Sequence, residues 1–149
     1  RESRGWDISD AFGKKDLGKS LEIVRRLAAQ QESSFMMIAM IHGRIKDLLV
    51  FRQAIDAKWA SVSDTGRGTG LKWNSLPPDI ERLFTEVMEK DPRSIHPYRA
   101  GLLAAQAMRF TQRKLMQCQK MAIEAHEKMV SGAVPDEMIL ELMLIRMLS

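Results

Sequence analysis

The chain has 149 residues, of which 45% are hydrophobic and 28% are charged, and its formal net charge is +4. This length is typical of one domain, and it is enough to bury a core without disulfides or a structural metal. The composition is that of a globular protein, and no stretch approaches about 18 uncharged apolar residues, which argues against a transmembrane helix.

The single cysteine, Cys118, leaves no possibility of a disulfide within the chain and fits a reducing, cytoplasmic compartment. The sequence opens at Arg1 rather than at a methionine, and no signal-peptide pattern follows. We therefore expect a fragment of a longer protein. The mild positive charge is scattered along the chain, which indicates solvated helix faces.

Helical periodicity predicts two N-terminal helices. The first covers Trp6–Gly13, with Asp7 or Ser9 as its N-cap and the glycine as its end. Asp16 begins the second, whose apolar residues recur at spacings of three and four as one stripe: Leu17, Leu21, Val24 and Leu27.

A third, longer helix is expected from Ser33 or Ser34 to about Trp59. Its first half, residues 35–41, is apolar on every side, which predicts a position surrounded by other helices at the centre of the fold. Its second half is apolar on one side, at Ile45, Leu48, Leu49, Ile55 and Trp59.

Residues 60–76 are rich in Ser, Thr, Asp and Gly, so we predict a flexible loop there. Pro77 and Pro78 then start another helix, since proline is tolerated in the first turn. The core face of this helix is expected at Ile80, Leu83, Phe84, Val87 and Met88, and Asp91-Pro92 ends it.

Three more helices are predicted after this break. The first begins between Ser94 and Pro97, with helical spacing at Tyr98, Leu102, Ala105 and Met108 or Arg109. Thr111 caps the next, which ends at Ser131-Gly132 and carries one apolar face: Leu115, Cys118, Met121 or Ala122, Ala125 and Met129. The last begins at Pro135-Asp136, with an inward face of Met138, Ile139, Leu142, Ile145 and Leu148.

Taken together, these elements predict an all-α fold. It is a bundle of six to seven helices forming a single domain over residues 1–149. The connections are mostly short, which favours antiparallel neighbours in an orthogonal or up-down arrangement.

The search for catalytic or metal-binding patterns is negative. His42, His96 and His126 lack the spacing of a zinc site, and no cysteine pair is present. Cys118 lies on an apolar helix face, which is typical of a core residue. Residues 66–72 are glycine-rich but lack the spacing of a phosphate-binding Walker loop. We therefore expect neither an enzyme nor a bound cofactor or metal.

Most of the 11 methionines lie on predicted helices, where methionine fills core gaps and also forms adaptable protein-binding surfaces. The last helix carries Met143, Leu144 and Met147 in addition to its inward face, so it is apolar nearly all round. One flank of it would stay exposed in a single bundle, and such a patch is typical of a partner site. The residues thus indicate an interaction domain.

Several segments resemble, in their order and spacing, the C-terminal domain of the delta subunit of the bacterial DNA polymerase III clamp loader. They are Ser9-Asp10-Ala11, Lys14-Lys15-Asp16-Leu17, Val50-Phe51-Arg52-Gln53, His96-Pro97-Tyr98, Arg109-Phe110-Thr111, His126 to Gly132 and Pro135 to Ile145. Two features depart from the family pattern. Residues 60–94 are longer than its usual helical hairpin, and methionine stands where leucine is usual in the last segment.

The resemblance implies a collar domain, because clamp-loader C-terminal domains join into a closed ring that holds the complex together without nucleotide. The partners would be the gamma/tau and delta prime subunits. The sliding clamp would be reached through a region upstream of Arg1, and DNA at most indirectly. The domain would support clamp loading in DNA replication, whereas the DNA-directed DNA polymerase activity belongs to the parent complex.

A helical interface between subunits needs an apolar strip rimmed by charges. We place this interface on the outer faces of the last two helices, at Met129, Met138, Glu141, Leu144, Ile145 and Leu148. Burial of the same residues within the chain's own core is the alternative.

Two other functions stay open. A helical nucleic-acid-binding domain would use the basic residues Arg99, Arg109, Arg113 and Lys114, and steeply salt-dependent DNA binding would support it. A small helical enzyme would need a buried pocket with a perturbed His or Glu, and the sequence shows no such group.

Overall fold

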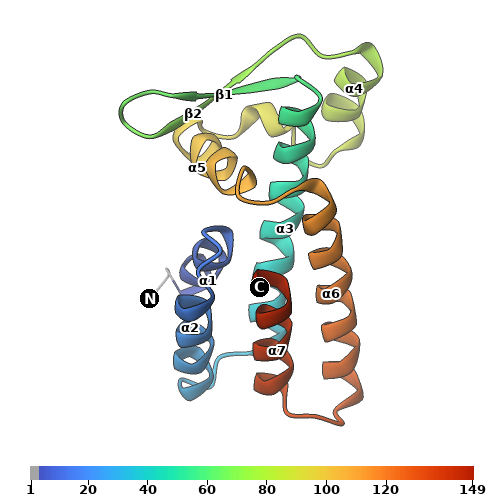
Figure 1. The fold of residues 1–149 in the computed structure, drawn as a ribbon. Helices are drawn as coiled ribbons and strands as arrows, with labels where there is room; N and C mark the ends of the chain where they lie inside the picture. The colour runs from blue at the N-terminus through green and yellow to red at the C-terminus, as the bar shows by residue number, and fades with distance from the viewer. Residues whose placement is uncertain (1–3) are drawn as a thin grey trace.

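Seven α-helices and one β-hairpin make up residues 4–149, the part of the chain that this computed structural model describes. The elements are α1 (Arg4–Gly13), α2 (Leu17–Ala29), α3 (Ser34–Asp56), β1 (Ala60–Asp64), β2 (Thr69–Trp73), α4 (Pro78–Arg82), α5 (Pro97–Ala107), α6 (Gln112–Ser131) and α7 (Asp136–Leu148) (Figure 1). A π-helical turn, η1 (Leu83–Val87), and a 3-10 turn, η2 (Pro92–Ser94), lie between α4 and α5. The mostly helical fold confirms the all-α prediction, with the hairpin as an addition.

Helix α3 is the central element. It packs against α1, α5, α6 and α7, and β1 contacts it as well. Figure 1 shows α6 alongside α3, α1 and α2 on the opposite side, and the hairpin with α4 at one end. Buried side chains of α1–α3 and α5–α7 form one continuous hydrophobic cluster. None of the helices within residues 4–149 combines the length and apolar character needed to cross a membrane.

Side-chain caps fix the starts of three helices where the sequence predicts them. The backbone N–H of Lys19 donates to the Asp16 carboxylate at 3.0 Å at the start of α2. Ser33 and Thr111 accept in the same way from the third residue beyond them, at 3.2 and 3.0 Å. Each cap satisfies a backbone N–H that has no partner within its own helix.

The predicted start of the first helix is wrong. Helix α1 begins at Arg4, so Ser9 lies inside it, and its hydroxyl donates to the Met40 carbonyl at 3.3 Å instead of capping the helix. The side chain of Asp7, the other predicted cap, lies outside the described side chains. This hydrogen bond links α1 to α3, because Met40 lies on α3.

Helix α6 buries the predicted face, at Leu115, Cys118, Ala122, Ala125 and Met129. Gly132 ends the helix with a left-handed φ of 73°, as glycine at this position permits. The predicted face of α5 is wrong, because Tyr98 is 79% exposed. The buried face lies at small residues beside it, which let α5 approach β2 and α3 closely: Ala100, Gly101, Ala104 and Ala107, with Leu103.

The first half of α3 is not surrounded, which corrects a third expectation. Met37, Ile38 and Ile41 are buried, whereas Phe35 and Met40 are exposed on the opposite side. A helix that is apolar all round therefore leaves part of its surface open here. Phe35 packs its ring against the edge of His126 on α6, at a centroid distance of 5.4 Å.

Residues 60–76, predicted as a flexible loop, contain an antiparallel β-hairpin instead. The register runs from Ala60 opposite Trp73 to Asp64 opposite Thr69. The turn uses Gly66 and Gly68 at φ values of 79° and 125°, a backbone region that favours glycine. The Thr65 amide closes the turn by donating to the Gly68 carbonyl at 2.9 Å.

Tertiary packing explains why this segment forms strands. Gly101 of α5 lies against the Thr69 carbonyl of β2 so closely that an added Cβ would collide with it. Further along β2, Trp73 meets Phe51 of α3 edge-on at 6.1 Å and Phe84 of η1 at 5.7 Å. Such aromatic contacts stabilise the hairpin beyond the area that they bury.

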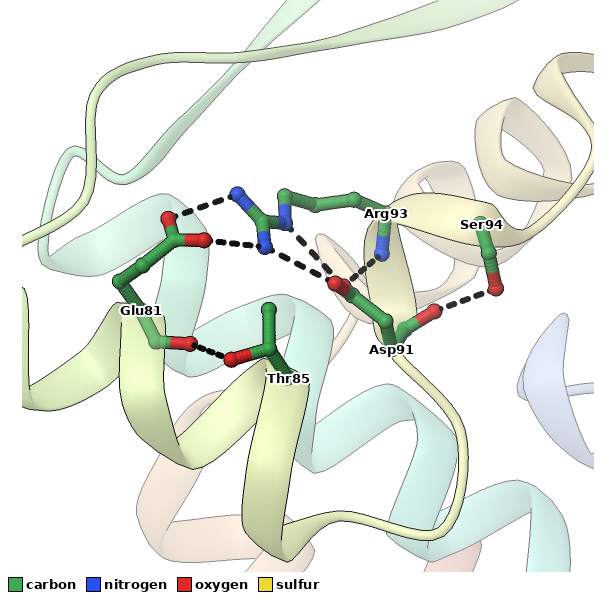
Figure 2. A network of polar contacts seen from close by, with 5 residues as sticks. All are labelled: Glu81, Thr85, Asp91, Arg93 and Ser94. Atoms are coloured by element: carbon green, nitrogen blue, oxygen red, sulfur yellow. Dashed lines mark hydrogen bonds and ion pairs between the residues drawn. The ribbon is translucent and has the colours of Figure 1, made fainter.

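The segment after the hairpin is held by Arg93 (Figure 2). Its guanidinium donates to Glu81 of α4 at 2.9 and 3.0 Å and to Asp91 at 2.8 Å, and it also lies over the Phe84 ring. The predicted apolar face of this region is largely wrong. Of Ile80, Leu83, Phe84, Val87 and Met88, Phe84 alone is buried, and residues 83–87 form a π-helix in place of the expected α-helix.

A buried polar cluster joins three helices. Arg44 of α3 donates to Asp10 of α1 at 2.9 Å and to Gln106 of α5 at 2.8 Å. Gln106 also packs directly over Gly13, where an added Cβ would collide with it. A buried guanidinium is tolerated when such partners satisfy it.

Candidate subunit interface

An exposed apolar stripe runs along α7. Met138, Leu142 and Ile145 are 51%, 54% and 41% exposed, the spacings of four and three placing them on one face. We call these three residues the α7 stripe. A contiguous apolar patch on one helix face is typical of a protein contact site.

The opposite face of α7 is anchored in the core, so the stripe is presented on a fixed helix. Its buried residues are Ile139, Leu140, Met143, Leu144, Met147 and Leu148. Helices α2 and α6 both pack against it. The acidic residues Asp136 and Glu137 in the first turn complement the positive end of the helix dipole.

An ion pair borders the stripe. Arg25 of α2 donates two hydrogen bonds to the Glu141 carboxylate, both at 3.2 Å. Hydrogen bonding and charge from Arg25 lower the pKa of Glu141, so this carboxylate stays ionised. The Arg25 side chain is 60% exposed and that of Glu141 23%, so the pair supplies a charged rim more than stability.

A shallow groove of about 300 Å³ lies between α6 and α7 and adjoins the stripe at Leu142. Its floor is apolar and includes Met121, Val134 and Met143. Its edge carries Glu124, Lys128 and Arg146. An apolar strip with a mixed-charge edge is the usual anatomy of a protein–protein interface.

The structure separates the six predicted interface residues into two groups. Met138 and Ile145 are exposed on the α7 stripe, and Glu141 lies at its rim. Met129, Leu144 and Leu148 are buried in the chain's own core, so their side chains are removed from the expected contact surface. Leu144 is 0% exposed, so its side chain packs in the chain's own core and does not reach a partner.

Sequence reasoning missed Leu142, the most exposed member of the stripe, and expected Met138, Leu142 and Ile145 to face inward. The helix is apolar nearly all round, so apolar spacing alone did not set its orientation. The polar residues of α7 did indicate its orientation. Glu141 lies one turn before Ile145, and Arg146 one turn after Leu142, so both mark the helix face that carries the stripe.

A second apolar groove, of about 410 Å³, lies between α3 and α6. It is lined by Phe35, Ile38, Ala39, His42, Ala122, Ile123, His126 and Glu127. Burial and then the charge of Lys46 lower the pKa of His42, and its Nε2 has no hydrogen-bond partner among the described residues. Within residues 4–149, no three His, Cys, Asp or Glu side chains gather in a way that could hold a metal.

The basic residues of the alternative nucleic-acid hypothesis fall into two places. Arg99 lies close to Asp47, Arg44 and Asp10, away from the start of α6. Arg109, Arg113 and Lys114 lie together at the turn between α5 and α6 and in the first turn of α6. Three of the four basic residues considered for nucleic-acid binding therefore lie close together.

Comparison with known proteins gives one finding. The family model for the C-terminal domain of the DNA polymerase III delta subunit matches residues 88–147. This segment contains η2, α5, α6 and nearly all of α7, including the whole α7 stripe. No curated protein and no solved structure matches the chain.

Proposed function

We propose, from the match of residues 88–147 to the family model for the C-terminal domain of the DNA polymerase III delta subunit, that the chain is a clamp-loader collar domain. Its function would be to assemble the delta subunit with neighbouring loader subunits and thereby to support loading of the sliding clamp in DNA replication. It would work with the replication machinery of the cytoplasm. The contribution of this domain would be binding rather than catalysis.

The observation that carries the proposal is the α7 stripe. Three large apolar side chains on a well-anchored helix remain in contact with water in the isolated chain. Covering each of them removes apolar surface from water, which stabilises a complex by about 25 cal/mol per Å² of buried area. The stripe lies within the family-matched segment, so it belongs to the part of the chain that the comparison recognises.

The surroundings of the stripe suit a helix of a neighbouring subunit. The groove between α6 and α7 adjoins Leu142 and offers a recess for an apolar side chain of a partner. The rim carries both signs of charge, through Glu141 with Arg25 on one side and Arg146 on the other. Charges of both signs at a rim select the partner's orientation more than they add affinity. We propose the gamma/tau and delta prime subunits as these neighbours.

The proposal is tested by mixing the chain with the other clamp-loader subunits in the absence of nucleotide and measuring complex formation by size-exclusion chromatography. We expect co-elution for the unmodified chain. Leu142→Asp places a charge in the centre of the contact, and burying an unpaired carboxylate there costs several kcal/mol, or more than about 100-fold in affinity. Co-elution should then be lost.

The matched control is Val87→Asp in η1, where the side chain is 70% exposed and far along the chain from α7. This variant introduces the same charge into an apolar surface position and should co-elute normally. Equal losses for both variants, or no loss for Leu142→Asp, would show that the α7 stripe is not the contact. Circular dichroism of both variants checks that the helices are retained.

A further inference from the structure

Four basic side chains gather at one corner of the molecule, where the α1–α2 turn and the α5–α6 turn meet. We call this set the basic corner. It consists of Lys15, Arg109, Arg113 and Lys114, of which Arg113 and Lys114 lie in the first turn of α6. It is separate from the α3–α6 groove and from the buried cluster around Arg44.

Three contacts hold these elements together. The Lys15 ammonium lies 5.3 Å from the ring centroid of Phe110, the residue that follows Arg109. Phe110 in turn stacks on Phe12 of α1 at 5.4 Å. Lys114 Nζ donates to the Arg146 carbonyl at 3.4 Å, which ties the start of α6 to the end of α7. These contacts fix Lys15 beside Phe110 and Lys114 beside the end of α7.

Little negative charge opposes this corner. The sequence contains no Asp or Glu between Asp91 and Glu124, so α5, the turn and the first half of α6 carry positive charges alone. Two carboxylates next to the corner are already engaged. Asp16 accepts from the Lys19 amide at 3.0 Å, and Asp56 accepts from Gln112 at 2.9 Å and from Arg52 at 3.2 Å.

The geometry of the corner fits phosphate groups. Arg109 precedes α6, a helix of 20 residues, and Arg113 lies in its first turn. The backbone N–H groups of that first turn point toward the same end of the helix. Guanidinium forks and helix N-termini are the groups that most often contact nucleic-acid phosphates.

We propose that the basic corner binds the phosphate backbone of duplex nucleic acid without reading base sequence. A single strand is the weaker match, since sequence-tolerant single-strand sites stack bases on exposed aromatic rings. The aromatic ring at this corner, Phe110, is buried beneath Lys15. This inference goes beyond the assembly function and does not depend on it.

The test measures binding of the chain to a short fluorescent DNA duplex by anisotropy over a range of salt concentrations. If all four cations contact phosphates, the logarithm of the binding constant should fall with a slope of about −3.6 against the logarithm of salt. Between about 50 and 200 mM salt this is a loss of about 150-fold in affinity. The double variant Arg109→Ala/Arg113→Ala should reduce the slope by about 2, to a loss of about 10-fold.

The control removes the same charge elsewhere. Arg67→Ala/Lys72→Ala changes two exposed cations of the hairpin, and it should leave the slope of the unmodified chain unchanged. An equal fall in slope for both double variants would overturn the proposal, because binding would then reflect net charge alone. So would absence of duplex binding at about 50 mM salt. Displacement of DNA by polyglutamate at equal charge would overturn the assignment to nucleic acid in favour of an acidic protein segment.

Discussion

Leu142 and Leu144 provide a comparison of one residue type at two positions of one helix. Leu144 is 0% exposed, whereas Leu142 is 54% exposed. Truncating Leu144 to alanine removes three buried carbon groups, which is roughly 2.4 kcal/mol of transfer free energy at about 0.8 kcal/mol per group. The cavity left behind raises the total to about 3–5 kcal/mol of unfolding free energy. In a chain of this size that loss lowers Tm by roughly 6–20 °C.

Leu142→Ala should lower the free energy of unfolding much less. About half of this side chain is already in water, and alanine favours the helix slightly, so the loss of unfolding free energy should stay below about 1 kcal/mol. Urea unfolding followed by circular dichroism measures both variants. Similar losses at the two positions, or a larger loss for Leu142→Ala, would refute the orientation of α7 from which the stripe is derived.

Three further predictions concern the rest of the fold. Gly101→Ala should displace β2, because the new Cβ meets its backbone, and faster amide hydrogen exchange in residues 60–73 would report this. Arg44→Leu should cost about 1–3 kcal/mol in urea unfolding, since it leaves the buried Gln106 without its donor. The lowered pKa of Glu141 means that its pairing with Arg25 stabilises the fold at neutral pH, and that this contribution is lost as pH falls below 4.5. Arg25→Gln should abolish this part of the acid sensitivity and return the NMR-titrated pKa of Glu141 toward 4.5.

Three helix starts could be predicted from the sequence because they depend on local chemistry. Asp16, Ser33 and Thr111 cap α2, α3 and α6 as expected, and Gly132 ends α6. Each of these signals needs one side chain and the backbone within a few residues of it. Distant parts of the chain have little influence on them.

Helix orientation was predictable where polar and apolar residues alternate clearly, as in α6. It was not predictable for α7, whose apolar residues surround the helix, nor for α5, whose buried face is made largely of alanine and glycine. Small residues carry little hydrophobic signal, yet they decide how closely two elements approach. For this reason an exposed flank was expected on α7, but half of the residues assigned to the interface lie on the buried side.

The hairpin depended on contacts that sequence spacing does not reveal. Thr69, Leu71 and Trp73 alternate with Gly70 and Lys72, which is a weak strand signal in retrospect. The packing of β2 against Gly101 and of Trp73 against two phenylalanine rings joins residues far apart in the chain. Propensity alone, with several serines and glycines in the segment, favoured a loop.

Site-specific crosslinking of the chain mixed with the other clamp-loader subunits tests the proposed contact of α7 most directly. A photoreactive amino acid placed at Leu142, and in a second variant at Ile123 in the α3–α6 groove, reports which apolar surface a neighbour covers. We predict a crosslink from position 142 to a neighbouring loader protein in the absence of nucleotide. A crosslink from position 123 with none from position 142 would contradict the assignment of the α7 stripe as the assembly surface.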